Sequence, residues 1–219
     1  MNNRYEFRII KDNEAEQAVS IEQVCFPPNE ACSEKNMIER IKNAPELFLV
    51  AVDKETGKIA GSLNGLATDE EIFRDEFFKD AYLNNSKGKN VMILGLSILP
   101  EYRRQGLARE LVRQYALKEK KNNREKLILT CLDAKVPMYL DFGFTDHGIS
   151  DSVWAAEDQD ISSNNSRTVF AHEHYQEVLY GKSQPLLLDW QNKADRASYL
   201  STVLHPFPET EWIGEGEVP

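Results

Sequence analysis

The stretch "VMILGLSILPEYRRQGLARELV", residues 91–112, decides the fold of this chain. It opens with an almost unbroken apolar run from Val91 to Leu99, which is typical of a central strand that is buried on both faces of a sheet. A short turn with two arginines follows, and a helical pattern over 105–121 begins without a gap. A helix N-terminus leaves backbone N–H groups without partners and carries a partial positive charge, so this order predicts an anion site suited to phosphate.

The residues at the start of that helix fit such a site. Gly106 lets the backbone approach an anion closely, and Ala108 keeps the path open. Arg103, Arg104 and Arg109 add positive charge. The motif is not a P-loop because no Gly-Lys-Ser/Thr follows, and it is not a dinucleotide fingerprint because it holds one glycine. The alternative interpretation is a charged helix start that faces solvent.

Alternating and apolar patterns predict a mixed α/β domain around this stretch. Further strands are expected at 5–10, 47–53, 59–67, 126–132 and 144–149. Helices are expected at 13–25, after the Ser33 cap, at 69–83 and at 134–143. Two prolines in "FPPNEACS" (26–33) separate the first two helices, because proline breaks a helix.

The composition is that of a soluble globular protein and excludes several functions. The 219 residues are 41% hydrophobic and 28% charged, with a net charge of −10, which argues against binding nucleic acid or an anionic membrane. The longest apolar run is far too short to span a bilayer. Cys25, Cys32 and Cys131 form no Cys-x-x-Cys, so we interpret them as reduced thiols in a cytoplasmic protein.

Three motifs together resemble one known family. The pattern Arg103-x-x-Gly106-x-Ala108 after a central strand resembles the acetyl-CoA motif of the GCN5-related N-acetyltransferase (GNAT) superfamily. "LTCLDAKVPMYLDFGF" (129–144) and "CFPPNEACSE" (25–34) resemble two further segments, and the likeness is closest to the arylalkylamine N-acetyltransferase-like branch. Several such motifs in the correct order are a much more specific signal than any one of them alone.

The resemblance implies a fold and a division of the chain. The expected α/β (α+β) architecture is the GNAT fold, a central mixed and mostly antiparallel sheet flanked by helices. Its central strands, here 91–99 and 126–132, splay apart and take the pantetheine arm between them. We expect the acetyltransferase domain at 1–156 and an acidic C-terminal extension at 157–219, whose apolar segments, "PLLLDW" among them, predict packing on the domain body or on a second subunit of a homodimer.

The resemblance also implies acetyl-CoA as the cosubstrate. Backbone N–H groups around Leu96, Ser97 and Ile98 would hold the pantetheine and polarise the thioester carbonyl, as an oxyanion site does. The pyrophosphate would be held by backbone N–H groups at the start of the helix, from Arg104, Gln105, Gly106, Leu107, Ala108 and Arg109, with Arg103 beside them.

Two side chains are candidates for proton transfer. Tyr139 matches the family tyrosine near the CoA sulfur and is the candidate general acid, with a core tyrosine as the alternative. A His-x-His found in vertebrate arylalkylamine enzymes is absent, because Met92 and Leu94 occupy the matching positions. The insect enzymes point instead to Glu30 as the base, with an exposed loop carboxylate as the alternative. No metal is expected, since "AHEH" (171–174) alone is a weak ligand pattern.

The resemblance therefore implies an N-acetyltransferase that moves the acetyl group from acetyl-CoA to a primary amine by direct attack in a ternary complex. A small arylalkylamine is the first expectation for the acceptor. The alternatives are a protein or peptide N-acetyltransferase and a non-catalytic regulatory module that binds acetyl-CoA, because the phosphate motif fits all three.

Overall fold

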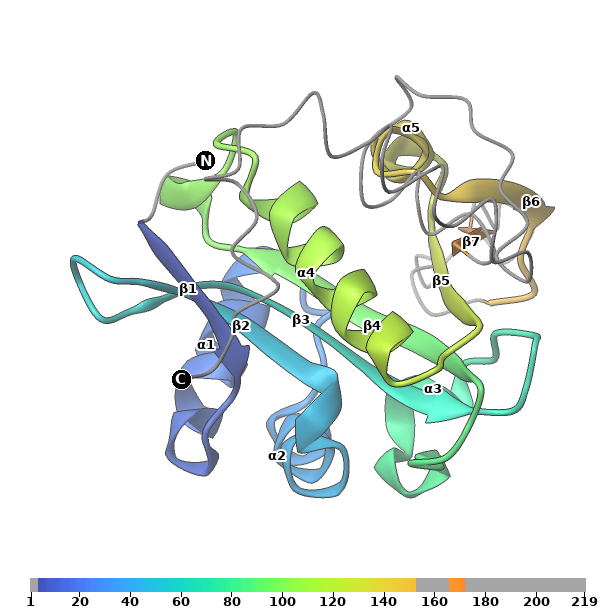
Figure 1. The fold of residues 1–219 in the computed structure, drawn as a ribbon, viewed down its shortest axis with the longest axis horizontal. Helices are drawn as coiled ribbons and strands as arrows, with labels where there is room; N and C mark the ends of the chain where they lie inside the picture. Colours follow the sequence, from blue (N-terminus) through green and yellow to red (C-terminus); the bar gives the residue numbers. More distant parts are fainter. Residues whose placement is uncertain (1–3, 153–165, 172–219) are drawn as a thin grey trace, which may run out of the picture.

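One sheet organises the protein, whose computed structural model describes residues 4–152 and 166–171. The strand order among these residues is β1-β2-β3-β4-β5-β7-β6, and the β4–β5 pair is parallel whereas the other neighbours are antiparallel (Figure 1). The strands are β1 (Tyr5–Ile9), β2 (Phe48–Asp53), β3 (Ile59–Thr68), β4 (Asn90–Ile98), β5 (Lys126–Leu132), β6 (Thr145–Ile149) and β7 (Ser166–Ala171). The predicted mixed, mostly antiparallel GNAT sheet is confirmed.

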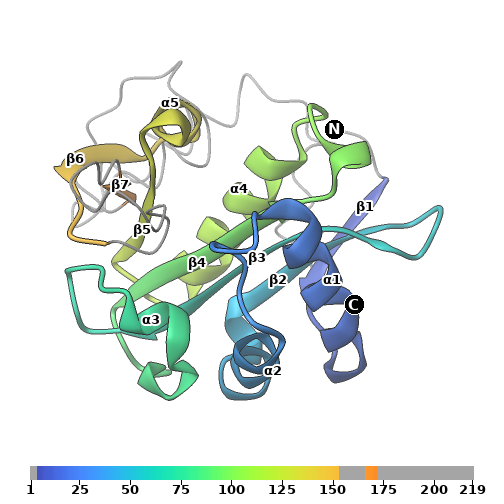
Figure 2. The same ribbon diagram turned by 180° about the vertical axis from the view of Figure 1, so that it is seen from behind.

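Helices cover both faces of this sheet. They are α1 (Ala15–Cys25), α2 (Glu34–Asn43), α3 (Glu76–Lys79), α4 (Leu107–Lys121) and α5 (Val136–Asp141). Short 3-10 turns lie at Asp12–Glu14, Pro45–Leu47, Ala81–Leu83, Pro100–Tyr102 and Asp133–Lys135. Figures 1 and 2 show α4 across one face and α1 and α2 on the other.

The two layers follow from the alternation of side chains along β2. Phe48, Val50 and Val52 pack with the apolar residues of α1 and α2, whereas Leu49 and Ala51 belong to the core beneath α4. All six residues of β2 are buried because both faces of the strand are covered. The core therefore lies on both sides of the sheet.

The central strands β4 and β5 separate along their length. Their parallel pairing runs from Asn90↔Lys126 to Met92↔Ile128 and stops there, although β4 continues to Ile98. The expected splay is thus confirmed, and it leaves backbone groups at the end of β4 beyond the reach of the neighbouring strand. That opening lies beside the N-terminus of α4.

The helix predicted over 69–83 is wrong. Only the short α3 and the turn Ala81–Leu83 are helical in this stretch. The Thr68 side chain accepts a hydrogen bond from Glu70 N (3.2 Å), and the Asn90 side chain donates to Glu70 O (2.9 Å). Such side-chain bonds compete with the helical ladder and hold the chain in turns.

The sheet continues beyond residue 156, where we predicted the catalytic domain to end. Strand β7 pairs with β5 from Leu127↔Ala171 to Leu132↔Ser166, and on its other side it pairs with β6. The extension therefore contributes a strand between two elements of the expected domain. "PLLLDW" (185–190) lies outside the described residues.

No helix in the described ranges combines the length and the apolarity that crossing a membrane requires.

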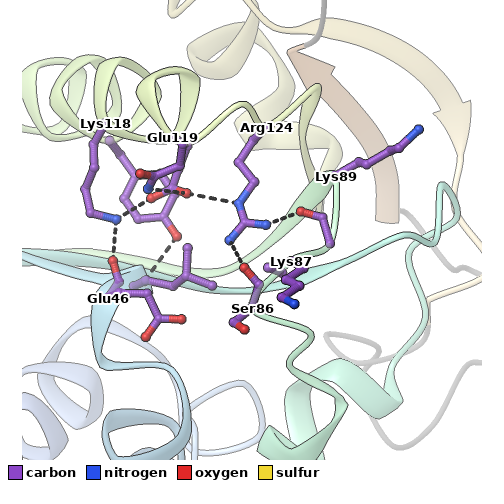
Figure 3. Close-up of polar contacts among 12 residues, drawn as sticks. Glu46, Ser86, Lys87, Lys89, Lys118, Glu119 and Arg124 are labelled. Atoms are coloured by element: carbon purple, nitrogen blue, oxygen red, sulfur yellow. Dashed lines mark hydrogen bonds and ion pairs between the residues drawn. The ribbon is translucent and has the colours of Figure 1, made fainter.

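A buried charged cluster fixes the end of α4 to the segment before β4 (Figure 3). Arg124 donates to the carbonyls of Ser86 (2.9 Å) and Gly88 and contacts the Glu119 carboxylate (3.4 Å). Lys118 contacts the same carboxylate and also donates to Glu46 O. Glu119 is fully buried, so these partners compensate for its loss of hydration.

We expect Arg124→Met to lower the free energy of unfolding by about 3 kcal/mol, because it leaves Glu119 buried with Lys118 as its remaining cation. Urea denaturation would measure this loss. Arg74→Met is the matched control, since the Arg74–Glu70 pair is on the surface and should contribute about 1 kcal/mol or less. Equal stability losses in the two variants would contradict a special role for the buried cluster.

Candidate active site

A cavity of about 870 Å³ occupies the opening between β4 and β5. One end reaches the turn before α4, where Arg104 and Gly106 line it. The other end reaches the C-terminus of α1 and the segment after it, where Glu22 and Glu30 line it. Between the ends, Tyr139 of α5 and apolar side chains of both strands form the wall. The structure thus brings together the two ends of the predicted site.

The turn before α4 presents backbone N–H groups to this cavity. Arg104 (φ +58°) and Gly106 (φ +79°) both adopt the left-handed conformation, which is uncommon for a residue other than glycine. Gly106 is the N-cap and has no side chain to bond the first turn of the helix. Glu110 N donates to Gly106 O (3.1 Å) in the first hydrogen bond of the helix. The N–H groups of the three residues that precede Glu110 therefore have no partner within the helix. This geometry matches the backbone anion sites of other helix starts.

The residues predicted to bind the pyrophosphate differ in the direction and the partners of their side chains. Arg103 donates from Nε to Ile98 O (2.8 Å), and Arg109 donates to Asp141 O (2.7 Å) on α5. Both line the cavity, as do Arg104, Leu107 and Ala108. Gln105 instead donates to Glu101 O (3.1 Å) and accepts from the Tyr5 hydroxyl (3.2 Å), so its side chain braces the turn from outside.

Two of the three residues predicted to hold the pantetheine lie at the open edge of β4. Leu99 N donates to Ala60 O on β3 (3.0 Å), so Ile98 turns its peptide groups toward the opposite edge. The Ile98 carbonyl accepts from Arg103 there, and Leu96, two residues earlier, shares this direction. The β3–β4 register skips Leu94, which marks a bulge just before the open stretch.

Ser97 is the exception among those three residues. Its Cα pairs with Ser62 of β3, and its hydroxyl donates to the Glu22 carboxylate (3.0 Å) on the α1 side of the sheet. It is not among the described residues that line the cavity. The Ser97 side chain therefore lies on the α1 side of the sheet, and its predicted contact with the pantetheine stays a prediction.

Glu22 is a residue of this site that sequence reasoning missed. Its side chain lines the cavity although the residue is only 3% exposed, and burial raises the pKa of its carboxyl group. A signal was present in the sequence, because Glu22 follows Ala18 by four positions and Val19 by three in a predicted helix. A carboxylate on the apolar face of a helix is uncommon and calls for a partner.

Tyr139 lies in the wall of the cavity, on α5. Its ring makes edge contacts with Phe142 (6.1 Å between centroids) and Phe144 (5.5 Å). Burial raises the pKa of its phenol well above the usual value, and the nearby Cys131 adds to the shift. The hydroxyl therefore stays protonated over the physiological pH range and is a hydrogen-bond donor.

Glu30 also lines the cavity, in the segment between α1 and α2. A turn with Glu30 N donating to Pro27 O (2.9 Å) positions it, and the residue is half-buried. Partial burial raises the pKa of its carboxyl group, whereas the charge of Lys135 acts in the opposite direction. The prediction that Glu30 reaches the substrate end is consistent with its place in the lining.

The described residues hold no cluster of three or more His, Cys, Asp or Glu side chains that could bind a metal ion. His172 and His174 of "AHEH" lie outside the described residues.

Comparisons with known proteins agree with this architecture. The profile of the acetyltransferase (GNAT) family matches residues 15–144. The loading GNATL domain of CurA from Lyngbya majuscula is similar in structure, with a TM-score of 0.66, 16% identity and coverage of 80% of this chain and 100% of that one. The GphF GNAT-like decarboxylase in complex with isobutyryl-CoA has a TM-score of 0.61, 14% identity and coverage of 76% and 98%.

Ard1 from Thermoplasma volcanium is also similar, with a TM-score of 0.56, 15% identity and coverage of 77% of this chain and 97% of that one. At these identities the three structures show the fold alone. A search of curated protein sequences finds no match.

Proposed function

Because the chain belongs to the acetyltransferase (GNAT) family, we propose that it transfers the acetyl group of acetyl-CoA to the primary amine of a small arylalkylamine. One observation carries this proposal. A single cavity connects the uncapped N-terminus of α4, the open edge of β4 and an end that holds two carboxylates and aromatic rings. We assign these three parts of the cavity, in that order, to the phosphates, the thioester and the amine.

The residues present fit acetyl-CoA. A Cβ atom at Gly106 would meet nothing within 4 Å, so the space in front of the helix N-terminus is open to a phosphate group. The opening beyond Met92↔Ile128 is bordered by the peptide groups of Leu96 and Ile98, which suit the amides of a pantetheine arm. When bound, acetyl-CoA supplies the activated acyl group.

The acceptor end favours a small aromatic amine over an extended peptide. Phe26 follows α1, the Phe78 carbonyl accepts from Arg40, and Met138 lies on α5 beside Tyr139. All three line the cavity and provide apolar surface for an aryl group. Glu22 and Glu30 line it as well and suit a cationic or hydrogen-bonding amine. The same features support the arylalkylamine-like branch suggested by the motifs at 25–34 and 129–144.

The reaction places two requirements on the protein. As the C–N bond forms and the C–S bond breaks, the amine must lose a proton and the CoA thiolate must be stabilised. Tyr139 is the proposed donor to the departing sulfur. Burial raises the pKa of Tyr139, so the phenol stays protonated and can donate a hydrogen bond to the sulfur.

An acceptor panel tests the proposed function. Purified protein, acetyl-CoA and a series of arylalkylamines, polyamines and short peptides are combined, and free thiol release is followed. We expect turnover with arylalkylamines and much less with peptides. Preference for peptides would favour N-terminal acetylation, and acetyl-CoA binding without turnover on any acceptor would favour a regulatory module.

We expect Glu30→Gln to raise the KM for the amine about 10-fold with a smaller change in kcat, because the carboxylate pairs with the amine before reaction. The half-buried position of Glu30 limits the size of the effect. Steady-state kinetics at saturating acetyl-CoA would measure both constants. An unchanged KM in a folded variant would remove Glu30 from the amine site.

A further inference from the structure

A buried polar cluster lies beneath β4 at the acceptor end of the cavity. It consists of Glu22 on α1, Arg40 on α2, Asn64 on β3 and Ser97 on β4, each between 1% and 3% exposed. Glu22 accepts from the Ser97 hydroxyl (3.0 Å) at one carboxylate oxygen and from Cys32 N (3.4 Å) at the other. Two neutral donors thus orient the carboxylate.

Arg40 stabilises this cluster through hydrogen bonds to groups other than the Glu22 carboxylate. Its guanidinium donates to Asn64 Oδ1 (3.0 Å) and to Phe78 O (2.7 Å). Its charge favours the ionised form of Glu22, but burial opposes ionisation more strongly. A carboxylate in a tight ion pair would be a weak base. The hydrogen bonds of Glu22 come from Ser97 and Cys32, and burial, which raises its pKa, outweighs the lowering by these donors and by Arg40.

Gly95 opens the cluster to the cavity. Gly95 and Glu22 both line the cavity. A Cβ atom at Gly95 would lie 3.7 and 3.8 Å from the two Glu22 oxygens and 3.1 Å from Asn64 Nδ2. Because Asn64 Oδ1 accepts from Arg40, the orientation of the amide is fixed and Nδ2 is the atom near Gly95. A donor and an acceptor therefore converge on one spot of the β4 backbone.

The donor at this spot is unsatisfied. Among the residues that the structure describes, Asn64 Nδ2 is a buried polar atom without a hydrogen-bond partner. A buried amide without a partner costs free energy, so such a group points to a polar ligand atom or water. A water molecule matches the chemistry, since it accepts from Asn64 and donates to Glu22.

We propose that Glu22 is the proton acceptor of the reaction, and that it takes the amine proton through a water held between its carboxylate and the Asn64 amide. This inference rests on the proposed amine acetylation. As the C–N bond forms, one N–H proton passes to the water, and a water proton passes to Glu22, which becomes a neutral carboxylic acid. As the C–S bond breaks, the thiolate receives its proton from Tyr139, and exchange with solvent restores both side chains.

The electrostatic setting supports a base at this position. The groups that face Glu22 are Arg40 from α2, the thiols of Cys25 and Cys32, and the hydroxyl of Ser97 from β4. Burial raises the pKa of the Glu22 carboxyl group, which brings it closer to the operating pH of a general base. Glu30, at the rim, then acts as the amine anchor.

Glu22→Gln is the decisive variant. The new amide can keep both contacts, because its oxygen accepts from Cys32 N and its nitrogen donates to Ser97. We expect kcat to fall about 100-fold, the typical contribution of general base catalysis, with acetyl-CoA affinity unchanged by calorimetry. The rise of kcat with pH through the Glu22 pKa should disappear. Glu16→Gln, an exposed carboxylate on the same helix, is the control and should behave as wild type.

Stability provides a readout that does not depend on turnover. A carboxyl group whose pKa is raised in the folded state destabilises the fold as pH rises from its unfolded pKa through its folded one. Glu22→Gln lacks this ionisation. We therefore expect the Tm of the variant, relative to wild type, to increase from about pH 4 upward.

The outcomes separate this inference from the proposed function. Wild-type kcat and an unchanged pH profile in folded Glu22→Gln would overturn the role of Glu22 while amine acetylation stands. A Tm difference independent of pH would also count against it, because Glu22 would then not titrate as a buried carboxyl. A wild-type protein that acetylates no amine would overturn the proposed function, and the role of Glu22 would fall with it.

Discussion

A folded Gly106→Val protein is expected to bind acetyl-CoA at least about 100-fold more weakly than wild type. Gly106 has φ +79°, a conformation that a β-branched residue avoids, and its Cβ position faces open space at the N-terminus of α4. The valine would both shift the turn and occupy the place of the phosphate. Loss of two charge-assisted hydrogen bonds at about 1.5 kcal/mol each accounts for this factor.

The control separates backbone strain from the loss of the site. Gly57, in the turn between β2 and β3, has φ +70° and likewise meets nothing within 4 Å of its Cβ position. Gly57→Val should lower the Tm by a similar amount and leave acetyl-CoA affinity unchanged in calorimetry. Unchanged affinity in the Gly106→Val protein would place the anion site elsewhere.

Tyr139→Phe should lower kcat by about 100-fold and leave acetyl-CoA affinity nearly unchanged. In the proposed role of Tyr139, the phenol donates to the sulfur as charge develops there, so its loss should affect the transition state more than binding. Its ring contacts with Phe142 and Phe144 remain in the variant, which preserves the wall of the cavity. Rapid-quench measurement of the acetyl-transfer step would report the chemistry directly.

Tyr115→Phe is the matched control for this change. Tyr115 is fully buried on α4, and its hydroxyl donates to Leu47 O (3.1 Å) away from the cavity. Its loss should cost about 1 kcal/mol of stability and leave kcat unchanged. If Tyr139→Phe shows the same pattern, with wild-type chemistry and a small stability loss, Tyr139 is a core residue.

Much of the fold could be predicted because its signals are local. The apolar run before Arg103, the glycine at the helix start and the alternation along 47–53 each act within a few residues. The helix expected at 69–83 failed because its charged, amphipathic pattern resembled a helix, while Thr68 and Asn90 bond the backbone there and hold it in turns. The place of β7 could not be predicted either, because strand order is a choice among distant partners.

The sequence by itself, through its motifs and their resemblance to the GNAT family, predicted the splayed strand pair that the structure shows. It also singled out Tyr139 and Glu30 as candidates, and the structure puts both in the lining of one cavity. Only the tertiary structure decided what surrounds the acceptor. Glu22 and Ser97 are 75 residues apart, and Asn64 lies between them in the chain on another strand. A carboxylate becomes a candidate base through burial and an opening to the cavity, and packing between α1, α2 and the sheet creates both.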